Sequence, residues 1–349
     1  MKKFFQFFLS CAILILAIPL IPILGSENSI DLRQSLTSEK ELSSSESSQS
    51  SSPAQEESSS APKNEETAQP EQITVLHHDT GQTETMSMLD YVIGVVCAEI
   101  PASFEEETIK AQAVVAYTYA RYQMGLTDDQ QGEAVPQIST DPAHNQAFAS
   151  KKEFQKRYGD SWEENWEKIT SCVKQVFPQT LTYEEQPIAA AFHAISSGNT
   201  EDASNVWGSD LPYLTAVSSE GDLQAPGYEQ TVSFSLEETK NLLSSSLENP
   251  DFSQDPAAWF SIQSTTPSGY ADEMTVCSVP TNGQIIRSIF SLRSADFTVV
   301  YENEEFQFTT RGYGHGVGMS QYGANYLALQ GQTYDQILAH YYPGTILTG

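Results

Sequence analysis

The first 72 residues cannot bury a globular core, and this restricts the fold to the rest of the chain. Residues 1–25 begin with Met and two lysines and continue as an apolar run with few polar interruptions. Such a run is long enough to cross the hydrocarbon part of a bilayer, and it ends without a small-x-small cleavage signature. We predict an uncleaved membrane anchor with the lysines inside the cell; a cleaved signal peptide is the alternative.

The segment that follows, residues 26–72, has the composition of a disordered tether. More than half of residues 43–60 are Ser, and most of the remainder are Glu, Gln, Pro and Ala. Chains this polar cannot offset the entropy of ordering by burying apolar surface. We therefore expect a single-pass protein of the cell membrane whose residues 73–349 fold outside the cell, at a distance that suits a cell-wall substrate.

Charge excludes two classes of partner for the folded part. The chain has 17 Lys and Arg residues against 46 Asp and Glu residues, a net charge of −29. Nucleic-acid binding needs clustered cations that this chain lacks, and a negative field does not attract anionic lipids.

Cys97, Cys172 and Cys277 lie far apart, so we expect three buried thiols, or one disulfide with a thiol left over.

Periodicity predicts an α+β fold with a mixed helix and antiparallel-strand core. We expect a hairpin at 73–77 and 84–88, helices at 89–98 and from about 104 to 124, and a third at 162–176. Ser103 and Glu106 form a predicted capping box for the second helix, whose inward stripe is Ile109, Ala113, Ala116 and Ala120. Strands are expected at 180–183 and 188–194, and two short helical stretches close the chain. Residues 222–308 read as an inserted smaller β-rich unit, with a helix at 236–246 and strands at 259–264, 274–278, 285–292 and 297–301.

Most catalytic motifs are missing or incomplete. The glycines at 312, 314, 316 and 318 are not followed by Lys-Ser or Lys-Thr and do not match GxGxxG. The six histidines form no HExxH pair, and no CxxC exists to hold a structural zinc.

Glu99 is a candidate catalytic residue, because it directly follows an apolar helix. The carbonyl end of that helix and the apolar neighbours both favour a protonated carboxyl group, as a general acid requires. The alternative is that Glu99 merely caps the next helix or faces water.

Seven sequence blocks, in order, resemble the stage II sporulation protein D family. They are residues 90–104 (DYVIGVVCAEIPASF), 109–114 (IKAQAV), 192–201 (FHAISSGNTE), 206–208 (VWG), 212–214 (PYL), 312–324 (GYGHGVGMSQYGA) and 341–344 (YYPG). Together they span essentially all of residues 73–349, which the resemblance makes the catalytic domain.

This resemblance implies a lytic transglycosylase of peptidoglycan that works during engulfment of the forespore. The bond cleaved would be that between N-acetylmuramic acid and N-acetylglucosamine, on strands already stripped of stem peptides, with a 1,6-anhydro product. The position that matches the family's catalytic acid is Glu99, and no cofactor is implied. The implied partners are an engulfment amidase, the stage II sporulation protein P, and the membrane protein M of the same group; the implied location is the sporulation septum and engulfing membrane.

The other blocks are expected to build the substrate groove. Tyr119 and Tyr213 could present aromatic surface to sugars, and several polar residues could bind hydroxyl and acetamido groups. For each of them a purely structural role is the alternative: Thr200 and Glu201 could cap a turn, Trp207 could belong to the core, and the glycines around His315 could pin a tight crossing. The candidate substrate-binding residues are Gln112, Tyr119, His193, Ser196, Thr200, Glu201, Tyr213, His315 and Gln321.

Three departures from the family pattern affect the expected activity. Tyr117 and Thr215 stand where many relatives have Arg and Lys, and Arg121 could replace the first of these cations. Ser139 and Asn145 stand where some relatives have zinc-binding cysteines around His144, so we predict no metal. The loss of cations keeps a second function open, that of a non-catalytic glycan-binding module that activates or positions a cell-wall amidase.

Overall fold

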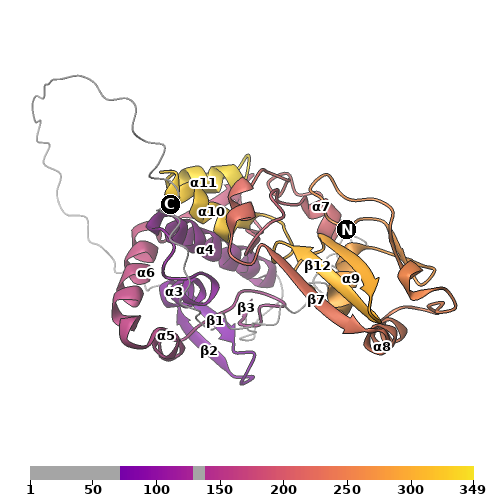
Figure 1. Cartoon of the computed structure of the whole chain (residues 1–349). Helices are drawn as coiled ribbons and strands as arrows, with labels where there is room; N and C mark the ends of the chain where they lie inside the picture. Colours follow the sequence, from indigo (N-terminus) through magenta and orange to yellow (C-terminus); the bar gives the residue numbers. More distant parts are fainter. Residues whose placement is uncertain (1–70, 129–137) are drawn as a thin grey trace, which may run out of the picture. The chain divides into compact units, whose positions relative to one another are not determined.

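The computed structural model describes residues 71–128 and 138–349, and it opens with the expected hairpin (Figure 1). Strand β1 (Gln72–Leu76) pairs antiparallel with β2 (Thr83–Ser87), and β3 (Ile138–Ser139) adds to β1 in parallel. The predicted anchor and nearly all of the predicted tether lie outside the described residues. Glu71 and Gln72, which we assigned to the tether, are in the fold, since Gln72 begins β1.

Helix α3 (Met88–Glu99) follows the hairpin without a loop, as predicted. Ser87 caps it, because its hydroxyl oxygen accepts a hydrogen bond from the Asp90 backbone N–H. The helix is almost wholly buried from Tyr91 to Cys97. The end of α3 is therefore fixed on several sides, which matters because Glu99 is its last residue.

Helix α4 (Glu106–Asp128) is the centre of the first hydrophobic core. Figure 1 shows it between α3 and α6 (Trp162–Val176) on one side and α10 (Gln321–Leu329) and α11 (Tyr334–Tyr341) on the other. Its predicted inward stripe is buried: Ile109, Ala113, Ala116 and Ala120 are all at most 2% exposed. Small side chains on this stripe let the neighbouring backbones approach closely.

The predicted capping box of Ser103 and Glu106 is wrong. The helix begins at Glu106, two residues later than that box requires, and the Glu105 N–H donates instead to Asn325 Oδ1 at 2.8 Å. Asn325 of α10, far along the chain, thus supplies an acceptor for a backbone N–H at the start of α4. Sequence spacing around Ser103 could not reveal this partner.

The polar segment before α6 contains a helix that the sequence analysis missed. Helix α5 (Lys151–Tyr158) starts with a complete capping box between Ser150 and Glu153, and the short 3₁₀ helix η1 (Gly159–Ser161) joins it to α6. Only Phe154 of α5 is buried, so the helix has little apolar periodicity to detect. The predicted bounds of α6 are confirmed.

The middle of the chain forms short strands in place of the long one predicted at 188–194. Strand β4 (Thr180–Tyr183) pairs with β5 (Gln186–Pro187) and β14 (Ile346–Thr348), and β6 (Phe192–His193) pairs in parallel with β13 (Met319–Ser320). The backbone between β5 and β6 includes local turn bonds, such as that from Ala191 N–H to Ala189 O, which interrupt the strand. The β6–β13 pair joins the block at 192–201 to the block at 312–324.

A second hydrophobic core lies within residues 222–308 and consists largely of aromatic side chains. Phe306 and Phe308 are at its centre, surrounded by Trp259, Phe290 and Phe297. Two antiparallel sheets enclose it, ordered β11-β12-β7 and β10-β9-β8. The elements are β7 (Glu229–Ser235), α8 (Leu236–Ser246), η3 (Pro256–Ala258), β8 (Phe260–Ile262), β9 (Met274–Val276), β10 (Val279–Thr281), α9 (Gly283–Ile289), β11 (Phe297–Glu302) and β12 (Glu305–Arg311).

One predicted strand in this region is a helix, and three strands, β7, β10 and β12, were missed. Residues 285–292 were expected to be extended because they are rich in isoleucine, but they contribute most of α9. The Asn282 side chain caps this helix by accepting from Ile285 N–H, and Ile286 is fully buried. Strands β7 and β12 escaped detection because their outer faces mix Glu, Gln and Thr with few apolar residues.

The expected α+β class is confirmed, as several small sheets pack with helices. Two of the strand pairs, β1 with β3 and β6 with β13, are parallel, so the sheets are not purely antiparallel. The expected free thiols are also confirmed: Cys97, Cys172 and Cys277 are buried and unpaired. Within residues 71–128 and 138–349, every helix is too short or too polar to span a bilayer.

Candidate active site

Glu99 is the last residue of α3 and is partly buried. Its Oε1 accepts a hydrogen bond from the Ala147 backbone N–H at 2.8 Å, so it does not cap α4. Burial raises the pKa of the carboxyl group to about 7, although the Ala147 N–H, the Gln321 side chain and the charge of Arg157 pull in the opposite direction. Desolvation is therefore the dominant effect, and the group is poised to exchange a proton near neutral pH.

A close contact between α3 and the segment after β3 positions this N–H group. The Ala149 N–H donates to Gly94 O at 3.0 Å, and a Cβ at residue 94 would overlap the Phe148 ring. Only glycine lets the two backbones approach this closely. The glycine in α3 thus brings Ala147 to the end of the same helix, one and a half turns away.

Two glutamine side chains connect Glu99 to α4 and α10. Gln321, the first residue of α10, hydrogen-bonds Glu99, and its Nε2 donates to Gln112 Oε1 at 3.4 Å. Gln112 is fully buried, and its own Nε2 has no hydrogen-bond partner among the described residues. Of the residues predicted to bind substrate, Gln321 thus contacts Glu99 directly, and Gln112 is linked to Glu99 through Gln321.

Two further residues near Glu99 were missed by the sequence analysis. The Tyr91 hydroxyl donates to Gln146 Oε1 at 3.2 Å, and the charge of Glu99 helps to raise the pKa of Tyr91. Gln146 is 1% exposed, and its Nε2 is another buried donor without a partner among the described residues. Tyr91 lies in the first family block, which was a usable signal; Gln146 lies outside all blocks and gave none.

The two block histidines, His193 and His315, lie together and are neutral near pH 7. Burial lowers the pKa of His193 to about 4 and that of His315 well below its usual range. His315 Nδ1 accepts from the Val317 N–H at 3.1 Å, and its ring lies 5.2 Å from the Trp207 ring and 5.8 Å from that of His193. Neither imidazole supplies a positive charge at neutral pH.

The glycines around His315 allow two backbone segments to cross closely, which was the structural alternative to a role in substrate binding. Gly312, Gly314, Gly316 and Gly318 all have positive φ, and a Cβ at Gly314 would lie 2.6 Å from His193 Cβ. Side chains at these positions would strain the backbone or collide with β6. The crossing carries Tyr313 and Gln321, both of which interact with Glu99 at the end of α3.

Four other predicted residues direct their polar groups to partners inside the protein. Thr200 Oγ1 accepts from Val217 N–H at 2.8 Å, and the Tyr213 hydroxyl accepts from Ala189 N–H. The Glu201 carboxylate accepts from the Asp202 N–H, the Asn205 amide and the Thr266 hydroxyl. Ser196 donates from both N–H and Oγ to Asp222, a residue that the sequence analysis did not consider. Their roles toward substrate stay predictions.

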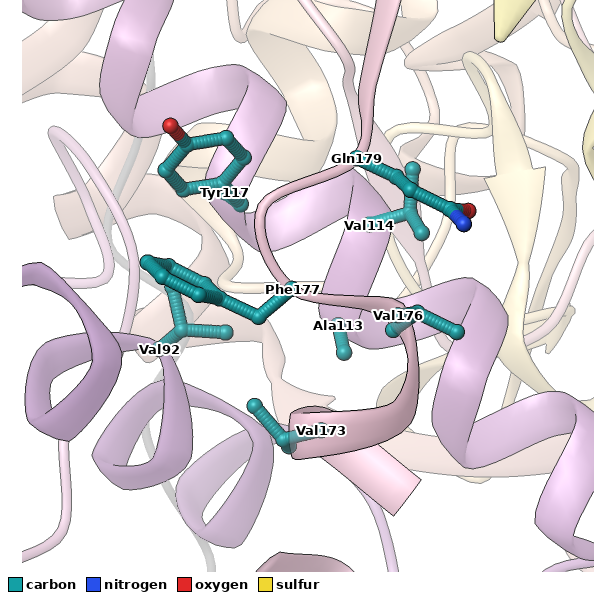
Figure 2. A pocket seen from close by; sticks show the side chains of 8 residues that line it. All are labelled: Val92, Ala113, Val114, Tyr117, Val173, Val176, Phe177 and Gln179. Carbon is teal, nitrogen blue, oxygen red and sulfur yellow. The ribbon is translucent and has the colours of Figure 1, made fainter. Parts of the chain in front are cut away.

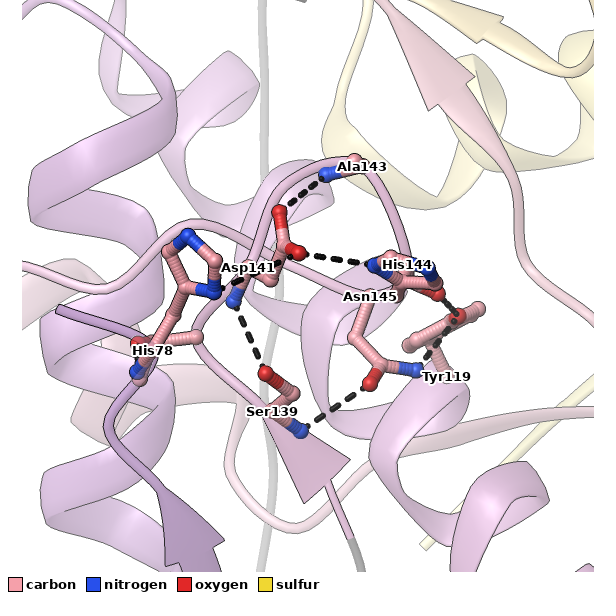
Figure 3. A network of polar contacts seen from close by, with 8 residues as sticks. His78, Tyr119, Ser139, Asp141, Ala143, His144 and Asn145 are labelled. Atoms are coloured by element: carbon pink, nitrogen blue, oxygen red, sulfur yellow. Dashed lines mark hydrogen bonds and ion pairs between the residues drawn. The ribbon is translucent and has the colours of Figure 1, made fainter. Parts of the chain in front are cut away.

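Tyr119, the remaining predicted aromatic, belongs to the network drawn in Figure 3. Its hydroxyl accepts from Asn145 Nδ2 at 3.2 Å, while Asn145 Oδ1 accepts from Ser139 N–H at 2.9 Å. In the same loop, Asp141 Oδ2 lies 2.7 Å from His144 Nδ1 and 3.4 Å from His78 Nδ1. Ser139 and Asn145, two of the positions at which we had weighed a zinc site, are thus joined by a hydrogen bond.

The expected replacement of a missing cation by Arg121 does not fit the structure. Arg121 Nη1 lies 2.7 Å from Glu71 Oε1, so its charge is paired with a carboxylate. The Tyr117 hydroxyl donates to the same carboxylate, and its ring packs against Phe177 in the small apolar pocket of Figure 2. These contacts tie Tyr117 and Arg121 to the chain just before β1.

Comparisons with known proteins agree with the blocks found in the sequence. Residues 77–183 match the family model described as "Stage II sporulation protein". The chain is 36% identical over 278 residues to stage II sporulation protein D of Bacillus subtilis, covering 80% of this chain and 79% of that protein. It is 35% identical to the Bacillus amyloliquefaciens protein of the same name, covering 79% of this chain and 78% of that one. The "Amidase enhancer" of Bacillus subtilis is 31% identical, over 73% of this chain and 40% of that protein. The chain therefore belongs to the stage II sporulation protein D family.

Proposed function

We propose that this protein is a lytic transglycosylase that cleaves peptidoglycan glycan strands between N-acetylmuramic acid and N-acetylglucosamine during sporulation. The observation that supports this most is the carboxyl group of Glu99, whose pKa burial raises to about 7. A carboxyl group with such a pKa can both donate and accept a proton at neutral pH. The family membership supports the same reaction.

The mechanism needs only one carboxyl group because the sugar supplies the nucleophile. Protonated Glu99 donates its proton to the glycosidic oxygen as the bond to the anomeric carbon breaks. The resulting carboxylate then accepts the proton of the muramic 6-hydroxyl, whose oxygen bonds to the anomeric carbon and closes the 1,6-anhydro ring. The Ala147 N–H and the Gln321 side chain stabilise the carboxylate between the two steps. No water is consumed, and Glu99 ends protonated.

Product analysis tests the reaction type. The full-length chain incubated with peptide-free glycan strands should release oligosaccharides whose reducing ends are one water lighter than hydrolysed ends, as measured by mass spectrometry. Ends of hydrolysed mass would mean that a water molecule attacks instead, which would contradict a transglycosylase. Peptide-bearing strands in parallel show whether stem-peptide removal must come first.

The pH dependence of cleavage follows from the state of Glu99. The proton donor is the neutral carboxyl group, so the active fraction falls as pH rises through about 7. We expect kcat/KM to decrease about tenfold per pH unit on the alkaline side of this pKa. The measurement is a series of initial rates from about pH 5 to about pH 9, with protein stability followed at each pH. A rate that increases across this range would show that Glu99 is not the acid.

A second candidate function is supported by the amidase enhancer among the relatives. In that reading the chain binds glycan and activates or positions a cell-wall amidase, here the stage II sporulation protein P, with protein M as a membrane partner. The paired state of Arg121 favours this reading, since it leaves the missing family cation unreplaced. Glycan binding without any anhydro product, together with faster amidase turnover on addition of the chain, would select it. Both readings place the protein in the cell membrane, with residues 73–349 outside the cell at the engulfing septum.

A further inference from the structure

Arg287 and Arg293 lie near the candidate active site, and no carboxylate among the described residues forms an ion pair with either of them. Arg287 lies in α9, and Arg293 lies in the loop between α9 and β11; both are partly buried. By contrast, Arg121 pairs with Glu71, and Arg311 pairs with Asp296 at 3.2 Å. The chain has 46 acidic residues against 17 basic ones, so two partly buried arginines without a carboxylate are unexpected.

Contacts with neutral groups hold the two side chains in place. The Arg293 guanidinium carbon lies 4.2 Å from the centre of the Tyr313 ring, and its Nη1 donates to Gln230 Oε1 at 3.0 Å. Arg293 Nε is buried with no hydrogen-bond partner among the described residues. Arg287 Nε donates to Arg293 O at 3.3 Å, and the Gly314 N–H donates to the same oxygen at 2.9 Å. The pair is thus fixed to the glycine-rich crossing beside the site.

Tyr313 packs against Arg293 and lies close enough to Arg287 and Glu99 for their charges to act on it. Burial raises the pKa of Tyr313; the charges of Arg293 and Arg287 act against this rise, whereas the charge of Glu99 adds to it. Burial lowers the pKa of both arginines, which means that their charge is poorly solvated. The neighbouring histidines are neutral, so they neither compensate this charge nor add to it. An anion that binds here would restore the interactions that water supplies elsewhere.

We propose that Arg287 and Arg293 bind a carboxylate group of the glycan and so determine which strands enter the site. The inference rests on the proposed function for the identity of the polymer. In a glycan strand the carboxylate is that of the lactyl group, which sits on the same muramic ring as the reacting anomeric carbon. A stem peptide converts this carboxylate into a neutral amide. The arginines are therefore specificity-determining residues that favour strands from which an amidase has removed the peptide.

The test compares one glycan in three chemical states. Binding to the full-length Glu99→Gln chain, which should not cleave, is measured by calorimetry with peptide-free oligosaccharides, with the same oligosaccharides carrying lactyl methyl amides, and with peptide-bearing oligosaccharides. We expect the free acid to bind about tenfold or more tightly than the methyl amide, because the acid can form a hydrogen-bonded ion pair with the arginines and the amide cannot. Equal affinity for acid and amide would overturn the proposal, and this comparison needs no arginine variant. Peptide-bearing strands that bind as tightly as the free acid would also overturn it, because the carboxylate would then come from the peptide.

Substitutions assign the effect to the arginines. Arg293→Gln and Arg287→Gln should bring the ratio of acid to amide affinity close to one without weakening binding of the amide. Arg311→Gln is the matched control, because that arginine already has Asp296 as its partner, and the ratio should be unchanged. A preference for the acid that survives in both glutamine variants would contradict the assignment. This outcome is separate from the test of catalysis. If the chain cleaves the glycan but binds acid and amide strands with equal affinity, the arginine site is wrong and the transglycosylase proposal remains. If the chain binds the acid selectively but does not cleave it, the arginine site remains and the transglycosylase proposal is wrong.

Discussion

Replacing Glu99 with Gln is expected to abolish cleavage of glycan strands while leaving the fold intact. The amide is nearly the same size as the carboxyl group, and its oxygen can still accept from the Ala147 N–H. It can neither donate a proton to the glycosidic oxygen nor accept one from the 6-hydroxyl. Loss of a general acid or base typically lowers rates by a factor of about 10² to 10⁴, and here one group performs both roles, so the loss should lie at the upper end or beyond.

The measurement is the initial rate of anhydro-product release, with circular dichroism and thermal unfolding as checks on the fold. Glu164→Gln is a matched control, because it makes the same change at an exposed carboxylate of α6. The control should retain the wild-type rate. If Glu99→Gln kept more than about a tenth of the wild-type rate, the acid would have to be a different residue.

Replacing Asp222 with Ala is expected to give the largest loss of stability. Asp222 is fully buried and accepts hydrogen bonds from Ser196 N–H at 2.8 Å, Ser196 Oγ at 2.6 Å and Ser320 Oγ at 2.7 Å. Its side chain thus ties the block at 192–201 to the start of α10, where Gln321 follows. Alanine would leave the Ser196 N–H and hydroxyl buried without an acceptor and would leave the Ser320 hydroxyl only Ala194 O, at 3.2 Å. We expect a cost of about 3 kcal/mol or more in the free energy of unfolding.

Denaturant unfolding of the full-length chain measures this change, and Asp210→Ala serves as the control because Asp210 is exposed. Asp222→Asn should fall between wild type and Asp222→Ala, since one oxygen acceptor remains. A stability change of less than about 1 kcal/mol in Asp222→Ala would mean that water or a rearranged partner replaces the carboxylate. The loss should also reduce cleavage, through displacement of Gln321.

The cysteines illustrate a feature that sequence reasoning could settle. Their wide spacing and apolar surroundings predicted free buried thiols, and burial raises the pKa of Cys97 to about 12 and that of Cys172 to about 11. Such thiols are protonated and unreactive at neutral pH. None of the three needs a partner residue from elsewhere in the chain, which is why local sequence was sufficient.

The helices and the candidate acid were predictable for a related reason. Periodic apolar residues define α3, α4 and α6 locally, and the position of Glu99 at an apolar helix end already favours a raised pKa. The prediction failed where local signals conflicted. Residues 285–292 contain isoleucines, which are typical of strands, but they follow a helix cap at Asn282. The cap and the burial of Ile286 stabilise the helical conformation, α9.

Sequence alone determined the family and the α+β class and singled out Glu99 as the candidate acid, because each depends on residues that are close together or in recognisable blocks. Only the tertiary structure decided what surrounds that group. The hydrogen bond from the Ala147 N–H to Glu99, the Asp222 carboxylate between two blocks and the contacts of Arg293 with Gln230 and Tyr313 all join segments that are distant in the chain. Packing of the whole domain sets these contacts, and with them the desolvation that fixes the protonation of Glu99.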